Sequence, residues 1–136
     1  MTYALRTTVE RPYAAVVEET RQALSDQGFG VLTEIDLQAT MKAKLDVEIA
    51  PQVILGACRP PLAHAALEAE PSIGLLLPCN VVVRASSETS TVVEAVDPQL
   101  MVGLTDNSAL QAVSDEAAGR LRAALGALDG TPVEQA

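Results

Sequence analysis

Two cysteines, one histidine and one methionine of this sequence could bind a soft ligand. Cys58 and Cys79 are the two thiols of the chain, and His64 and Met101 are candidate third donors. Thiolate and thioether sulfurs select Cu(I), and thiolate and imidazole suit Zn(II). Twenty residues separate the two cysteines, which is neither a CxxC redox motif nor half of a zinc ribbon. The sequence therefore predicts a ligand site only if folding brings the two sulfurs together.

Cys58 is the strongest single candidate, because it precedes Arg59 and the two prolines that open a predicted helix. The partial positive charge of a helix N-terminus and the full charge of Arg59 both favour a thiolate. His64 falls about one turn inside that helix, where the same dipole favours the neutral imidazole that binds metals. Arg59 and Asn80 complete the candidate ligand-binding set. The alternative is structural: buried cysteines are common as small apolar residues, and a buried Asn80 would bond to the backbone.

The elements that must position these residues follow an α+β pattern. We expect a mostly antiparallel sheet packed against helices, in one compact domain over residues 1–130, with a frayed tail over 131–136. Alternating or continuous apolar segments predict five strands, and helical spacing with proline and glycine boundaries predicts four helices. The strands are 3–9, 29–35, 53–57, 73–83 and 91–96, and the helices are 12–27, 37–45, 62–70 and 110–128, with a shorter helix or turn around Met101. The apolar run 73–83 predicts a strand covered on both faces.

Composition excludes several classes of function. The formal net charge of −9 and the absence of any lysine or arginine cluster argue against nucleic-acid binding. Aromatic residues make up 2% of the chain, too few for stacking surfaces or aromatic cages. No apolar leader opens the sequence and no apolar run is long enough to span a bilayer. We therefore expect a cytoplasmic protein without membrane contact, whose cysteines are reduced.

Three ordered segments resemble the domain-of-unknown-function family 302 (DUF302). They are GFGVLTEID at 28–36, ILGACRP at 54–60 and GLLLPCNVVV at 74–83, and Val96-Asp97-Pro98 with Met101 fits as well. The resemblance implies a compact α+β fold, a homodimer and no established activity. The family residues carry over as Glu34, Lys44, Cys58, Pro60, Ala63, Pro78, Cys79, Asn80, Asp97 and Met101. The family usually has Asn where this chain has Arg59, and an Asn side chain could cap the following helix, which Arg59 cannot do.

Three hypotheses about function remain open at this stage. The first is a homodimer that binds Cu(I), Zn(II) or a sulfur species through Cys58 and Cys79, with His64 or Met101 as a third donor. The second is a non-catalytic module whose valine-rich sheet packs against another protein or a second copy. The third is a thiol enzyme with Cys58 as nucleophile and His64 as base, ranked last because nothing in the sequence orients the histidine.

Overall fold

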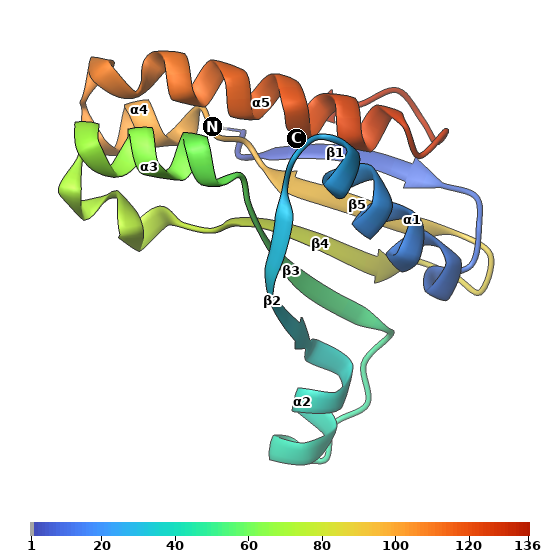
Figure 1. Ribbon diagram of the computed structural model, residues 1–136. Coiled ribbons are helices and arrows are strands. Elements are labelled where there is room, and N and C mark those ends of the chain that lie inside the picture. Colours follow the sequence, from blue (N-terminus) through green and yellow to red (C-terminus); the bar gives the residue numbers. More distant parts are fainter. Residues whose placement is uncertain (1) are drawn as a thin grey trace.

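The computed structural model describes residues 2–136 as one six-stranded sheet with helices packed against it (Figure 1). The strand order is β2-β3-β4-β5-β1-β6, and every neighbouring pair is antiparallel. The strands are β1 (Ala4–Val9), β2 (Gly30–Asp36), β3 (Gln52–Cys58), β4 (Cys79–Ala85), β5 (Thr91–Val96) and β6 (Glu134–Gln135). The α+β architecture with an antiparallel sheet is confirmed.

Two long helices, α1 and α5, cover one face of the sheet and form the main core with it. Leu5, Leu55 and Val81 from the strands are fully buried against Val16 of α1 and Leu121 of α5. The helices are α1 (Tyr13–Asp26), α2 (Leu37–Leu45), α3 (Pro60–Ala69), α4 (Leu100–Thr105) and α5 (Gln111–Gly126), with 3₁₀ helices η1 (Pro71–Leu76) and η2 (Ser108–Leu110). Within residues 2–136, no helix has both the length and the apolarity to cross a bilayer.

The opposite face of the sheet carries charged residues rather than a second apolar layer. Glu94 of β5 lies between Arg6 of β1 and Arg84 of β4: Arg6 Nε donates to Glu94 Oε2 over 2.8 Å, and an Arg84 Nη2 donor lies 2.9 Å from Oε1. On β4, Val81 and Val83 are buried, whereas the intervening Val82 is only half-buried. Within one chain, β4 is therefore covered on the helix face, and the predicted cover of its second face by a partner subunit stays a prediction.

The apolar run 73–83 is also not one strand. Its first half forms η1, which begins at Pro71, and only the residues from Cys79 onward form β4. Ile73 is fully buried in a second, smaller core with Met101 and Leu110. A continuous apolar run does not distinguish a buried strand from a buried helical turn, and the proline at Pro71 favours the helical start.

The C-terminal segment, predicted to be frayed, is hydrogen-bonded along the outer edge of β1. Thr131 N donates to Thr8 O over 2.9 Å, and Ala136 N donates to Ala4 O over 2.8 Å. In the short strand β6, Gln135 pairs with Leu5. The frayed tail is thus a wrong prediction, because the unpaired backbone groups of an edge strand provide partners for a polar segment.

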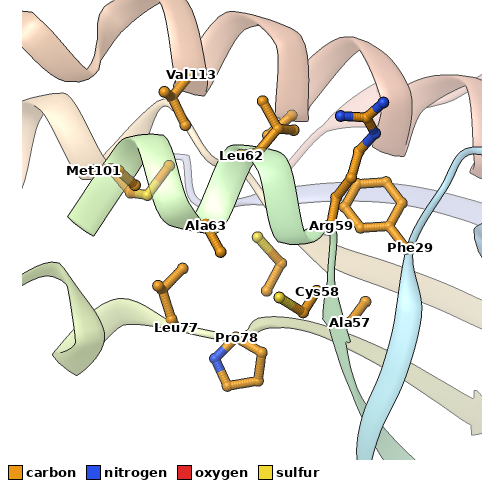
Figure 2. A pocket seen from close by; sticks show the side chains of 13 residues that line it. Phe29, Ala57, Cys58, Arg59, Leu62, Ala63, Leu77, Pro78, Met101 and Val113 are labelled. Atoms are coloured by element: carbon orange, nitrogen blue, oxygen red, sulfur yellow. The ribbon is translucent and has the colours of Figure 1, made fainter. Parts of the chain in front are cut away.

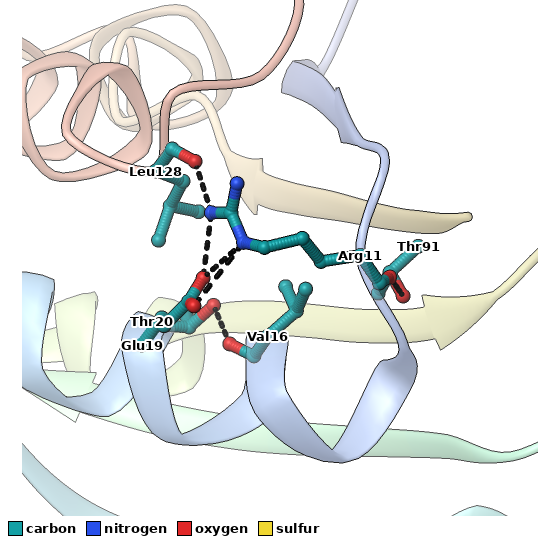
Figure 3. A network of polar contacts seen from close by, with 6 residues as sticks. All are labelled: Arg11, Val16, Glu19, Thr20, Thr91 and Leu128. Carbon is teal, nitrogen blue, oxygen red and sulfur yellow. Dashed lines mark hydrogen bonds and ion pairs between the residues drawn. The ribbon is translucent and has the colours of Figure 1, made fainter. Parts of the chain in front are cut away.

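Arg11 connects the start of α1 to the end of α5 (Figure 3). Its guanidinium donates to the carboxylate of Glu19 one and a half turns into α1 and to the carbonyl of Leu128 beyond α5. The carbonyl of Arg11 accepts a 2.8 Å hydrogen bond from the Thr91 hydroxyl at the start of β5. These contacts hold the two covering helices in place over the sheet.

Candidate functional site

The two cysteines lie at the ends of neighbouring strands. Cys58 is the last residue of β3 and Cys79 is the first residue of β4. In the antiparallel register, Ala57 pairs with Cys79, so Cys58 is one residue beyond the residue opposite Cys79. The fold therefore places the two cysteines at the same end of the sheet, despite their distance in the sequence.

Both cysteines line one cavity between the strand ends and helix α3 (Figure 2). Leu62 and Ala66 of α3, Met101 of α4, Val113 of α5 and Phe29 before β2 form much of its almost entirely apolar wall. The water-accessible volume is about 30 Å³. By this measure a single water needs roughly 10–15 Å³. The cavity therefore has room for one ion or one or two water-sized molecules, but not for an organic substrate of ordinary size.

The two thiols are free, and they differ in their surroundings. Burial raises the pKa of the Cys79 thiol from 9.0 to about 11, and negative charge on the nearby Cys58 contributes in the same direction. Both cysteines line the same cavity, and the charge on Cys58 acts on the Cys79 thiol across it. With a pKa of about 11, Cys79 is protonated at neutral pH, and it would have to lose this proton to bind a metal ion.

Arg59 is the one charged residue among those that line the cavity. Its Nε atom is buried and has no hydrogen-bond partner among the described residues, and the side chain packs against Gly28, where an added Cβ would lie 3.0 Å from Nε. Arg59 occupies the N-cap of α3 without a side-chain cap. Pro60 and Pro61 have no N–H, and the next two N–H groups donate to Arg59 O. The first turn of α3 thus offers Cys58 no free N–H donor, and the guanidinium of Arg59 points away from Cys58 (Figure 2).

His64 is not part of this cavity. Its side chain is 77% exposed on the surface of α3, and its Nε2 lies 3.1 Å from Glu68 Oε1, one turn further along the helix. Among residues 2–136, no three His, Cys, Asp or Glu side chains come together as metal ligands. The structure therefore places His64 apart from the two cysteines.

The other candidate residues divide between the cavity and the surface. Met101 is buried and lines the cavity, as do Ala63 and Pro78. Asn80 is exposed and pairs with Gly56 across the sheet, away from the cavity. Asn80 is thus not the buried residue whose amide would have to bond to the backbone, because strand alternation turns the residue after Cys79 to the open face.

Three further family residues, Glu34, Lys44 and Asp97, lie outside the cavity wall. Glu34 of β2 forms an ion pair with Arg21 of α1. Lys44 is exposed on α2. Asp97 is buried after β5, where it accepts hydrogen bonds of 3.0 Å from Gln99 N and 2.8 Å from Gln135 Nε2. These contacts give Asp97 a structural role at the start of α4.

Sequence reasoning missed two residues that shape the cavity, Phe29 and Val113. Phe29 is the single phenylalanine of the chain, and a large ring just before a strand in so aromatic-poor a sequence is a usable signal for a specific packing role. Val113 belongs to the apolar stripe of the last helix. The sequence predicts the helix 110–128 that contains Val113, but not that this end of the helix faces the cysteines.

Comparison with known proteins identifies relatives of this arrangement. A family model described as "Domain of unknown function DUF302" matches residues 5–128. The crystal structure of an uncharacterized conserved protein DUF302 from Bacillus stearothermophilus superimposes with a TM-score of 0.86, at 26% sequence identity, and the match covers 94% of this chain and 99% of that one. No curated protein matches the chain.

Proposed function

The chain belongs to the DUF302 family, and we propose that it is a cytoplasmic binding protein for one Cu(I) ion, held by Cys58 and Cys79 with Met101 as third donor. The observation that carries this proposal is that the three sulfur side chains line one small apolar cavity. Thiolate and thioether sulfurs are the donors that select Cu(I). In a reducing cytoplasm both thiols stay available as ligands.

The number of donors favours Cu(I) over Zn(II). A structural zinc site has four protein ligands, and a catalytic one has three. The described part of the chain has no cluster of three His, Cys, Asp or Glu side chains, and His64 is exposed beside Glu68. Two thiolates and a thioether are a poor zinc site but a suitable set for a soft monovalent ion.

The charge around the cavity also suits a monovalent ion. Two thiolates and one Cu(I) carry a net charge of −1, which is costly in apolar surroundings unless it is compensated. Arg59 is the one charged residue that lines the cavity, and its Nε is buried without a hydrogen-bond partner among the described residues, so a turn of its guanidinium toward the sulfurs would offset this charge.

The size of the cavity limits the competing proposals. A volume of about 30 Å³ excludes an organic substrate, although a small sulfur species such as hydrosulfide would fit. The thiol-enzyme hypothesis has less support, since His64 does not line the cavity and the cavity wall carries no carboxylate. Without a base to activate the thiol, Cys58 lacks the partner that nucleophilic catalysis needs.

An anaerobic competition titration tests the proposal. The reduced protein is titrated with Cu(I) against a chromophoric Cu(I) chelator. We expect one Cu(I) per chain, loss of this binding in Cys58→Ser and in Cys79→Ser, and unchanged binding in His64→Ala. Zn(II), titrated in parallel, should not displace the copper. Equal Cu(I) binding by the wild type and both serine variants would refute the proposal.

A further inference from the structure

We call the cavity of Figure 2 the cysteine cavity, and it adjoins a second cavity between the end of β5 and α4. The second cavity has a volume of about 70 Å³. Cys79 and Met101 line both cavities, so these two side chains form the boundary between them. Two of the three proposed sulfur donors can therefore be approached from the second cavity, without passing helix α3.

The second cavity has exposed side chains on its wall, whereas the cysteine cavity has none among the described residues. Leu76 of η1 and Leu104 of α4 line the second cavity and are 37% and 61% exposed. Every described residue on the wall of the cysteine cavity is buried or half-buried. The second cavity therefore connects Cys79 and Met101 with the protein surface.

A third cavity continues this path outward. It has a volume of about 230 Å³ and shares Asp97, Leu100 and Leu104 with the second cavity. Gln135, which is exposed, belongs to its wall. The three cavities thus follow one another from the surface to the cysteines, with Asp97 at the outer boundary of the second cavity and Met101 at its inner boundary.

Asp97 gives this path a negative charge. The residue is 4% exposed, and its carboxylate accepts hydrogen bonds from two neutral donors, Gln99 N and Gln135 Nε2. None of the ion pairs among residues 2–136 includes Asp97. A buried carboxylate without a cationic partner is costly, and each of its oxygens can accept more than one interaction. Asp97 would therefore stabilise a cation that enters the second cavity.

The far end of the cysteine cavity has the opposite charge. In Figure 2, Arg59 and Met101 lie at opposite ends of this cavity, with Cys58 between them. Arg59 is the one charged residue on the wall of the cysteine cavity, and Asp97 lines the cavity on the other side of Met101. Because like charges repel and opposite charges attract, a cation is repelled at the Arg59 end and attracted at the Met101 end.

We propose that Cu(I) reaches the two cysteines through the second cavity, with Asp97 attracting the cation and Met101 as the first sulfur to bind it. This route rests on the proposed function. Met101 can bind first because a thioether has no proton to lose, whereas the Cys79 thiol, with a pKa of about 11, is protonated at neutral pH. Each thiol then releases its proton to solvent as its sulfur binds the ion, and the ion stays Cu(I) throughout.

Anaerobic stopped-flow measurement of Cu(I) uptake from its acetonitrile complex tests the role of Asp97. Asp97→Asn, which keeps the shape of the side chain and removes its charge, should slow uptake by about tenfold and still bind one Cu(I) per chain. The matched control is Asp46→Asn, which removes the same charge at the exposed C-cap of α2 and should take up Cu(I) at the wild-type rate. Circular dichroism checks that both variants are folded. Equal rates in the two variants would overturn the route, whereas a wild type that binds no Cu(I) at equilibrium would refute the proposed function itself.

A neutral thiol reagent tests the route without copper, and so decides it whatever the result of the titration. In a Cys58→Ser background, methyl methanethiosulfonate can label only Cys79: the thiolate attacks the reagent's sulfur, a disulfide forms and methanesulfinate leaves. Adding Leu104→Ala should raise the labelling rate measured by mass spectrometry, and adding Leu104→Trp should lower it. Leu75→Ala and Leu75→Trp, at a position 88% exposed that lines neither cavity, are the matched controls and should leave the rate unchanged. Labelling that does not respond to Leu104, or that is accelerated by Leu62→Ala on α3 instead, would contradict the route.

Discussion

The largely buried thiol of Cys79 should make the stability of the protein depend on pH in the alkaline range. Its pKa is 9.0 in ordinary surroundings and about 11 in the folded chain. Because the folded-state pKa is raised, the neutral thiol stabilises the fold fully below pH 9, and this stabilisation is lost as the pH rises through 11. At pH 10, about nine tenths of the unfolded-state thiols but about one tenth of the folded-state thiols are ionised, which lowers the free energy of unfolding by about 1.4 kcal/mol relative to neutral pH.

The measurement compares urea unfolding of the wild type and Cys79→Ala at pH 7 and pH 10. Tyrosines and lysines titrate in both proteins, so the difference between the two pH dependences isolates Cys79. We expect the wild type to lose about 1.4 kcal/mol more than the variant between the two pH values. The variant itself should be less stable at pH 7 by about 1 kcal/mol, because the sulfur leaves a small cavity. Parallel pH dependences of the two proteins would refute the burial argument for Cys79.

Three further outcomes are expected. Gly56→Ala should destabilise the fold by about 1–3 kcal/mol in thermal unfolding, because the new Cβ would collide with the Thr33 hydroxyl and lie 2.8 Å from Pro78 Cγ. The control Gly119→Ala, on α5 with open space around it, should instead stabilise the fold by about 1 kcal/mol. Burial of Glu94 opposes its ionisation, but hydrogen bonds from two arginines lower its pKa. Glu94→Gln should therefore be less stable than the wild type by about 1 kcal/mol at pH 7. In urea titrations, this variant should also lose less stability than the wild type on acidification below pH 4.5. Met101→Leu, a volume-conserving change, should keep the melting temperature within a few degrees and weaken Cu(I) binding in the competition titration.

Local sequence signals predict most helices and strands, because the start of a helix or strand depends largely on the residues next to it. Asp36 predicted the start of α2 and forms its N-cap, and Pro60 with Pro61 predicted the start of α3. The wrong predictions concern segments whose conformation depends on contacts with residues distant in the sequence. The apolar run around Ile73 folds as a 3₁₀ helix into a second core with Met101, and the polar segment after Thr131 finds hydrogen-bond partners along β1.

The candidate site shows the same division. Residue chemistry identified both cysteines and Met101, but the cavity that joins them depends on the register of β3 and β4, which a separation of twenty residues does not specify. The predicted N-terminal effect of α3 was reasonable for a helix start, yet the two prolines and the bonds to Arg59 O leave no N–H for Cys58. His64 is a predicted donor because it falls about one turn inside a helix, where the dipole favours neutral imidazole, but its position on α3 turns it toward Glu68 and solvent.

X-ray absorption at the copper edge of the Cu(I)-loaded, reduced protein tests the proposed site most directly. The spectrum should show a three-coordinate Cu(I) ion bound by sulfur alone, and the thioether contribution should disappear in Met101→Leu while both thiolates remain. A spectrum with imidazole nitrogen in the first coordination shell, or one unchanged by Cys58→Ser and by Cys79→Ser, would contradict a site built from the two cysteines.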